Sequence, residues 1–139
     1  MKKLMILMLI AISLPFMACS SSGSETANEA TAVKPAKIEV YYFHYTRRCV
    51  TCNAVEDVTK NTLNELYADK MKSGEITFYS VNLDEKDGET IANKLKVAAQ
   101  GLIVVVDGKQ TDLTDKGFMY AKSSPDKLKS ELKKVIDGK

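Results

Sequence analysis

Residues 38–52 read IEVYYFHYTRRCVTC, an apolar run followed by two cysteines that are separated by two residues. The run is rich in β-branched and aromatic residues, which predicts a strand, and a helical pattern starts at Cys52. Cys49 and Cys52 therefore lie at a strand-to-helix corner, about one helical turn apart and close enough to close a small disulfide ring. The stretch indicates redox chemistry.

Cys49 is predicted to be the nucleophile of this pair. A thiol at a helix N-terminus meets unpaired backbone N–H groups and a partial positive charge, which stabilise the thiolate. Arg47 and Arg48 place two full positive charges immediately before it. We therefore expect Cys49 to be partly exposed and more acidic than a free thiol, and Cys52 to be more buried and to resolve the mixed disulfide.

The cysteine pair also has two alternative interpretations. It could contribute to a metal site, although structural zinc usually needs four ligands and His44 is the only other soft ligand of the domain. With His44, the pair could form a three-ligand site for a thiophilic ion such as Cu(I) or As(III). An inert bridge would close only a four-residue loop and contribute little chain entropy. Thiol–disulfide exchange is the favoured hypothesis, and thiophilic metal binding is the alternative.

Two further side chains could move protons at this corner. Glu56 follows Cys52 by four residues and so shares its helix face, where a carboxylate could accept or relay the proton of the resolving thiol. The simpler interpretation is a surface glutamate that pairs with Lys60. His44 ends the predicted strand and could shuttle a proton, whereas a packed histidine with one hydrogen bond is the simpler expectation.

The N-terminus has the pattern of an export signal. Two lysines at positions 2 and 3 precede an apolar run over residues 4–12, which is shorter than the ~20 residues that a membrane-spanning helix needs. Residues 16–19, FMAC, resemble a bacterial lipobox, in which the cysteine becomes the first residue of the mature protein and carries lipid. Phe16 departs from the leucine that is usual there.

We therefore predict a lipoprotein signal peptide over residues 1–18 and a lipid on Cys19. The protein would then be located in the cell envelope, anchored to a bacterial membrane and facing the periplasm or the exterior. The alternatives are an uncleaved anchor, or a cut before an ordinary free cysteine. Of the three cysteines in the chain, one would carry lipid and two would form the redox pair, in a compartment that permits disulfides.

Composition limits the remaining possibilities. The chain has 139 residues, of which 45% are hydrophobic, so one compact domain is expected. Loss of residues 1–18 removes two of the 20 basic residues and leaves 18, which equals the number of acidic residues. A neutral chain with scattered lysines gives no reason to expect a nucleic-acid partner. Residues 20–35 are small and polar and predict a flexible tether, so the folded domain is expected at residues 36–139.

Hydrophobic periodicity predicts an α/β domain with the element order βαβαββα, a mixed sheet and helices on both faces. Asp107-Gly108 predicts a tight hairpin, and Ser124 and Pro125 predict the start of the last helix. The pattern does not determine residues 114–123. The expected elements are strands at 37–44, 75–83, 102–106 and 109–113, and helices at 52–72, 89–96 and from 125 to just before Gly138.

This order, with the Cys-x-x-Cys motif at the start of the first helix, resembles the thioredoxin superfamily over nearly all of residues 37–139. Residues 81–84, VNLD, look like the end of the second thioredoxin strand, and the aliphatic strand closed by Asp107-Gly108 looks like the hairpin that follows. The resemblance implies a thioredoxin-like three-layer sandwich and a thiol–disulfide oxidoreductase that acts on protein or small-molecule disulfides and thiols.

A narrower resemblance involves residues 41–56, YYFHYTRRCVTCNAVE. They are similar to a group of small bacterial thioredoxin-like proteins, some of which are labelled as subunits of a nitrophenyl-compound reductase. This keeps open the role of an electron-transfer accessory subunit. Nothing in the chain resembles a flavin or nicotinamide fingerprint, so no cofactor is expected.

The chain departs from the thioredoxin pattern at three positions. Arg48 stands where thioredoxins have an aromatic residue, and Phe43 stands where they have a buried acid. No proline occurs in residues 97–102, and the position of the family's cis-proline falls at about Gln100. We still predict that Gln100 and Gly101 belong to the docking surface, on the argument that their strand begins beside the first strand in a parallel sheet. The alternative is that Gln100 is an exposed loop residue.

Overall fold

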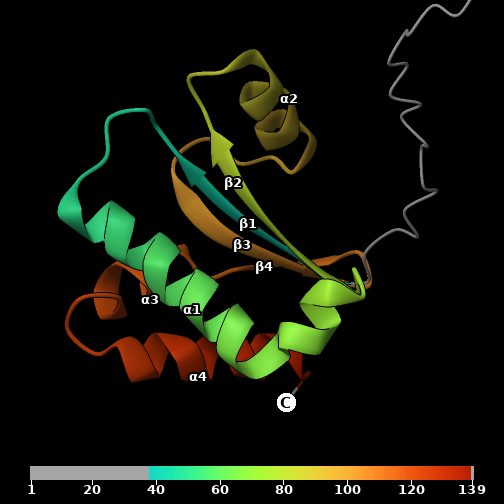
Figure 1. The fold of residues 1–139 in the computed structure, drawn as a ribbon. Helices are drawn as coiled ribbons and strands as arrows, with labels where there is room; N and C mark the ends of the chain where they lie inside the picture. Colours follow the sequence, from blue (N-terminus) through green and yellow to red (C-terminus); the bar gives the residue numbers. More distant parts are fainter. Residues whose placement is uncertain (1–37, 139) are drawn as a thin grey trace, which may run out of the picture. The chain divides into compact units, whose positions relative to one another are not determined.

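The computed structural model describes residues 38–138, so the predicted signal peptide, Cys19 and the predicted tether lie outside the described residues. The described chain is an α/β domain whose elements follow the expected order, with one additional helix (Figure 1). In chain order the elements are β1 (Ile38–His44), α1 (Val50–Lys72), β2 (Ile76–Asn82), α2 (Lys86–Lys94), β3 (Gly101–Val106), β4 (Lys109–Asp112), α3 (Thr114–Tyr120) and α4 (Pro125–Ile136).

The four strands form one mixed sheet in the order β2-β1-β3-β4. Strand β1 is central and apolar on both faces, as its sequence predicts. It pairs in parallel with β2 and antiparallel with β3, so Phe43 at the end of β1 lies opposite Gly101 at the start of β3. The expectation that β3 runs parallel to β1 was therefore wrong.

Alternation of side chains along β1 divides the core into two layers. Val40 and Tyr42 pack with residues of α1, α3 and α4, whereas Phe43 packs on the other face with Val81 of β2 and Ala92 of α2. Figure 1 shows α1, α3 and α4 together on one side of the sheet and α2 on the other. The expected three-layer arrangement is confirmed. Among residues 38–138, no helix has both the length and the apolar character needed to cross a membrane.

Helix α1 begins at Val50, two residues before the predicted start. Its buried residues include Val55 and Leu63, and the helix is kinked at Tyr67, where φ is −135° and ψ is 27°. The kink changes the face that is buried in the last turns. Tyr67 is buried and its hydroxyl donates to Asp137 Oδ1 at 2.9 Å, while the neighbouring Leu66 is 37% exposed.

The segments after β2 and β4 differ most from the sequence prediction. Helix α2 begins three residues before the predicted start at residue 89, and so it includes Gly88. Helix α3 occupies part of the undetermined segment, and its Gly117 packs against Val55 of α1. Ser124 stands at the N-cap of α4 but makes no capping hydrogen bond with its side chain, contrary to expectation.

The predicted hairpin between β3 and β4 is confirmed. Asp107 and Gly108 have φ values of 48° and 80°, the left-handed pair that a type I′ turn requires. The predicted start of α4 at Pro125 is also confirmed, and Leu128, Leu132 and Ile136 of this helix are buried in the core.

Candidate functional site

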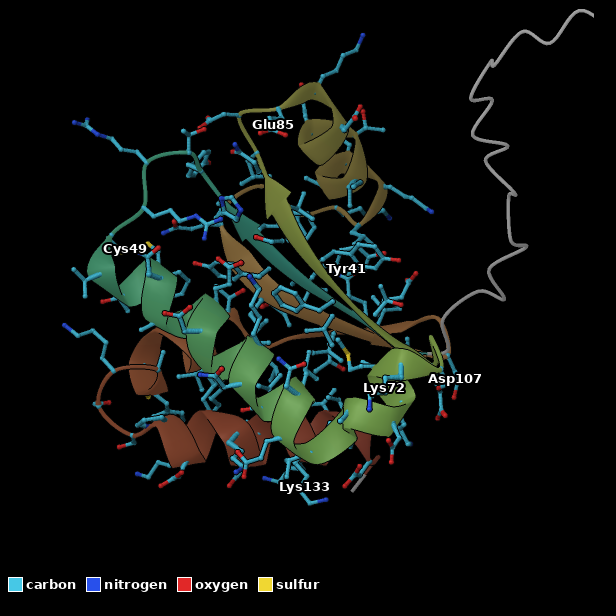
Figure 2. The ribbon with its side chains drawn as sticks, viewed as in Figure 1. Tyr41, Cys49, Lys72, Glu85, Asp107 and Lys133 are labelled. Atoms are coloured by element: carbon cyan, nitrogen blue, oxygen red, sulfur yellow. A yellow bond between two sulfur atoms is a disulfide. The ribbon has the colours of Figure 1, made fainter. Side chains whose placement is uncertain are left out.

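Cys49 and Cys52 form a disulfide at the start of α1, with their Cα atoms 5.0 Å apart. Cys49 is the N-cap residue of the helix, and its Sγ accepts a hydrogen bond from the backbone N–H of Cys52 at 3.1 Å. Cys49 is exposed, whereas Cys52 is only 4% exposed. Figure 2 shows Cys49 at the N-terminal end of α1. The sulfur of Cys49 thus occupies the helix position that favours a thiolate, on a residue that is exposed.

Tyr42 holds the first turn of α1 against the sheet, a contact that the sequence analysis missed. Its hydroxyl donates to the carbonyl oxygen of Cys52 at 2.8 Å in the core. Burial raises the pKa of Tyr42 to about 12, and the nearby Glu56 carboxylate also raises it while Arg48 opposes the shift. The sequence offered only an aromatic residue in a strand, and nothing in its pattern distinguishes a core tyrosine from one that contacts the helix.

Arg48 does not point towards the thiols as a free cation. Its guanidinium forms an ion pair with Glu56 and donates to His44 Nε2, and it lies 3.4 Å from Ser80 Oγ. Arg47 is exposed and makes no hydrogen bond or ion pair within residues 38–138. The expected stabilisation of a thiolate by the two arginines therefore has no direct contact in this structure, and it stays a prediction.

Glu56 is a buried acid rather than a surface glutamate. It is 5% exposed, and it pairs with Lys60 at 2.7 Å, as the simpler interpretation expected, and also with Arg48. Burial acts to raise the pKa of Glu56, but hydrogen bonds from Lys60, Ser80 and Arg48 offset this effect and hold the pKa below its ordinary value. A carboxylate with a lowered pKa is a weaker base, which argues against the predicted proton relay from Cys52.

We expect the stabilising effect of Glu56 to depend on pH. Because its pKa is lower in the folded protein than in the unfolded chain, Glu56 contributes stability above its ordinary pKa of 4.5, and this contribution is lost as the pH falls through the folded value. The free energy of unfolding of Glu56→Gln should lie below that of the wild type at pH 7, and the two should converge as the pH falls through the lowered pKa of folded Glu56.

The measurement is denaturant unfolding across this pH range. Glu65→Gln is the control, because Glu65 is 62% exposed in its pair with Lys129 and its substitution should have little effect at any pH. A wild-type advantage over Glu56→Gln that is constant with pH would contradict the assignment of Glu56 as a buried, ionised carboxylate.

His44 is buried and both of its ring nitrogens are engaged. Nδ1 lies 3.0 Å from the carbonyl oxygen of Tyr45, which can only accept, so Nδ1 carries the proton. Nε2 then accepts from Arg48 and lies 3.0 Å from Ser80 Oγ. His44 is therefore a packed histidine with more partners than expected. No group of three or more His, Cys, Asp or Glu side chains among residues 38–138 is arranged to hold a metal ion.

Gln100 lies beside the disulfide, although for a different reason than the one expected. Its Oε1 is 3.7 Å from Cys52 Sγ, because antiparallel pairing brings the start of β3 to the end of β1. Gly101 is buried, and a Cβ built there would lie 2.5 Å from Thr114 Oγ1. Glycine is therefore needed at position 101 because Thr114 of α3 lies so close to it, and not because a partner approaches the backbone there.

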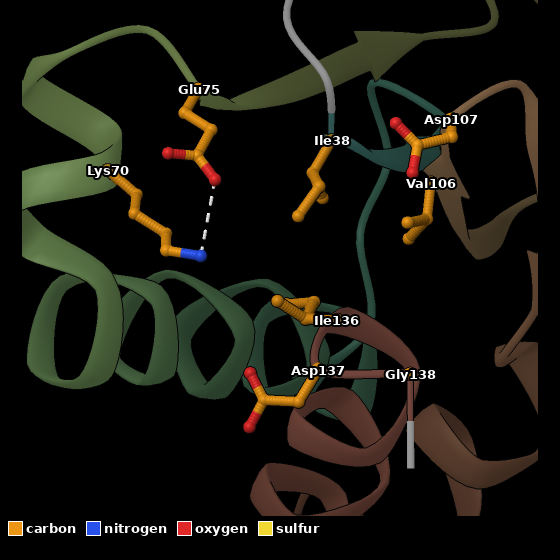
Figure 3. Close-up of a pocket in the computed structure, with 8 residues that line it drawn as sticks. All are labelled: Ile38, Lys70, Glu75, Val106, Asp107, Ile136, Asp137 and Gly138. Carbon is orange, nitrogen blue, oxygen red and sulfur yellow. Dashed lines mark ion pairs between the residues drawn. The ribbon is translucent and has the colours of Figure 1, made fainter.

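The surface around Cys49 is partly apolar. Val50, next to Cys49, is 72% exposed, and Tyr45 in the preceding loop is 40% exposed. A pocket at the opposite end of the sheet, shown in Figure 3, contains the Lys70–Glu75 ion pair at 3.2 Å and is lined by Ile38 at the start of β1. This pocket takes no part in the cysteine site.

Comparison with known proteins gives matches to structures only. No protein-family model matches the chain, and no curated protein matches it. Thioredoxin O2 from Arabidopsis thaliana in the oxidised state is similar, with a TM-score of 0.51, 22% identity, and coverage of 72% of this chain and 76% of that chain. A thioredoxin from Fasciola hepatica has a TM-score of 0.40, 23% identity, and coverage of 56% and 66%.

A malarial protein is similar with a TM-score of 0.46, 19% identity, and coverage of 70% and 96%. These matches give no support to the narrower resemblance to reductase subunits. The match to the Arabidopsis protein agrees with the mixed four-stranded sheet and the helices that cover it. The described part of this chain therefore has the thioredoxin fold.

Proposed function

We propose that this protein is a thiol–disulfide oxidoreductase in which Cys49 attacks and Cys52 resolves. The observation that carries the proposal is the position of Cys49. It is exposed, it caps α1, its sulfur accepts a helix N–H, and it is joined to the buried Cys52. An inert bridge would need neither an exposed cysteine nor a helix N-terminus beside it.

The reaction proceeds through two sulfur exchanges. The reduced protein attacks a partner disulfide with the Cys49 thiolate, so a bond forms between Cys49 Sγ and one partner sulfur while the other partner sulfur leaves as a thiolate. Cys52, as a thiolate, then attacks Cys49 Sγ, which closes the Cys49–Cys52 disulfide and releases the second partner sulfur. Two electrons pass from the protein to the partner, whose two thiolates take up protons. The structure has the oxidised form of the pair.

The proposal is tested by reduction of insulin disulfides with dithiothreitol as the electron source. The chain should accelerate the reaction well above the rate with dithiothreitol alone. A parallel titration with Cu(I) tests the metal-binding alternative. Absence of any acceleration, together with tight stoichiometric Cu(I) binding that depends on both cysteines, would favour the alternative.

Gln100 is proposed to contact the partner disulfide, since it lies at the sulfurs where thioredoxins have proline. Its amide can donate and accept hydrogen bonds, which proline cannot do through a side chain. In a Cys52→Ser background, which stops the reaction at the mixed disulfide, Gln100→Ala should lower the yield of trapped partner several-fold. Gln100→Pro should change which partners are trapped. Unchanged yields and partners in both variants would remove Gln100 from the docking surface.

Attachment to a membrane through a lipid on Cys19 is proposed from the lipobox-like residues 16–19 alone. The protein would then act in the cell envelope, where disulfides persist. Cys19→Ala should release the protein from membranes or mislocalise it, and leave the melting temperature of the domain unchanged. Fractionation of cells by ultracentrifugation measures this, and finding the unaltered protein in the soluble fraction would refute lipid anchoring.

A further inference from the structure

We propose that Arg48 is a positioning residue for the reaction of Cys49. Its guanidinium bridges β1 and β2 to α1, and so fixes the loop that presents Cys49 as the N-cap. This inference rests on the proposed thiol–disulfide exchange and adds a residue that acts through its neighbours. It replaces the expectation that Arg48 is simply a cation next to the thiolate.

The loop in question runs from residue 45 to residue 49, and it is held at two places. The first is Thr46, whose backbone N–H donates to Asp84 Oδ2 at 2.8 Å and whose Oγ1 accepts from Asn82 Nδ2 at 3.0 Å. Tyr45, Thr46 and Arg47 are all exposed. Arg48, directly before Cys49, is the residue of this loop whose side chain turns inward.

The loop is held a second time through the side chain of Arg48. One nitrogen of its guanidinium donates to Glu56 on α1, and the other donates to His44 at the end of β1 and lies 3.4 Å from Ser80 on β2. His44 is oriented for this contact, because its other ring nitrogen donates to the Tyr45 carbonyl at 3.0 Å. A planar guanidinium can donate in these two directions at once, whereas the ammonium group of lysine is a single point charge.

The charge of Arg48 favours a thiolate at Cys49, as its contacts with the loop do. Glu56 is also paired with Lys60, whose Nζ lies 5.5 Å from the centre of the Phe78 ring, and Asp84 accepts from the other part of the loop. Loss of the Arg48 charge leaves the Glu56 carboxylate with one cation instead of two. The uncompensated negative charge disfavours a thiolate at Cys49, and a looser loop weakens its contact with the helix N–H.

The experiment uses the full chain with Cys19→Ala and Cys52→Ser, so that Cys49 is its only thiol. The rate of alkylation by iodoacetamide is measured from pH 5 to pH 10. In Arg48→Gln the midpoint of the pH profile should move up by about one pH unit, with a loss of rate near neutral pH of about fivefold to tenfold. Arg48→Lys should not restore the profile. Arg47→Gln is the matched control, and it should leave the alkylation rate and the midpoint of the parent unchanged, because an exposed charge is screened by salt.

A second set of variants tests whether Arg48 acts on Cys49 through Glu56. If Arg48 acts through Glu56, the shift caused by Arg48→Gln should be clearly smaller when Glu56→Gln is already present. Ser80→Ala keeps every charge and removes one hydroxyl next to Arg48 and His44. It should slow alkylation of Cys49 about twofold. This variant tests the positioning role of Arg48 if Arg48→Gln does not fold.

Three results would overturn the proposal. They are an unchanged profile in Arg48→Gln, full recovery in Arg48→Lys, and an equal shift in Arg47→Gln. Melting curves of each variant confirm that a folded protein is being measured. Failure of the proposed function is distinguishable, because a chain that reduces no insulin still gives an alkylation profile from which the role of Arg48 is read.

Discussion

Cys49→Ser is expected to lower the rate of insulin-disulfide reduction to that of dithiothreitol alone. Cys49 is the exposed residue of the pair and Cys52 is buried, so Cys49 is the thiol of the described domain that is expected to begin the exchange. A serine hydroxyl at the same N-cap would still accept the helix N–H, so the domain should fold and retain its helix start. The measurement is the insulin turbidity assay, with the melting temperature of each variant recorded beside it.

Cys52→Ser is the matched comparison, because it removes the other half of the same disulfide. This variant should also turn over poorly, but it should accumulate a mixed disulfide with its partner, since Cys49 can still attack and nothing resolves the product. Non-reducing electrophoresis detects this adduct. If Cys49→Ser forms the adduct and Cys52→Ser does not, the roles of the two cysteines are reversed.

Gly88→Ala is expected to destabilise the domain by about 3 kcal/mol, which corresponds to a fall in melting temperature of roughly 10–20 °C. A Cβ at this position would lie 1.8 Å from the carbonyl oxygen of Asn82 and 2.7 Å from its carbonyl carbon. Both are backbone atoms, so α2 or the end of β2 must move. Intrinsic helix propensity predicts the opposite sign, because alanine is favoured over glycine within a helix by about 1 kcal/mol.

Gly74→Ala is the control for this substitution. Gly74 has φ of +75° and no atom within 4 Å of a built Cβ, so alanine there costs only the strain of a left-handed backbone, about 1 kcal/mol. Thermal unfolding of the two variants should therefore place Gly88→Ala well below Gly74→Ala. A Gly88→Ala protein as stable as the wild type would show that α2 does not pack this closely on β2.

Local sequence signals predicted the parts of the fold that depend on local physics. The hairpin follows from the left-handed preference of Asp107-Gly108, and α4 follows from Pro125 and its apolar stripe. Helix α3 has no such signal, because it contains Gly117 and is stabilised by packing against Val55 and Leu102. The antiparallel direction of β3 is likewise a long-range choice that the pattern of apolar residues does not encode.

In the candidate site, too, the features that depend on local sequence could be predicted and the long-range contacts could not. The cysteine motif and the helix start predicted the exposed Cys49 and the buried Cys52, because both depend on the position of each residue in one turn of helix. The partners of Arg48 and Glu56 could not be predicted in this way. A charged side chain next to a motif can point to the thiol, to solvent or to another element, and only the three-dimensional arrangement selects the contact with His44 and Ser80.

The most direct test of the account is the reactivity of Cys49 when it is the only thiol of the chain. In the Cys19→Ala, Cys52→Ser protein, the rate of alkylation is measured against pH and compared with a short unstructured peptide that contains one cysteine. We expect Cys49 to react several-fold faster than the peptide at pH 7, because its sulfur caps α1 and accepts a helix N–H. A rate equal to or below that of the peptide would contradict the assignment of Cys49 as the activated nucleophile.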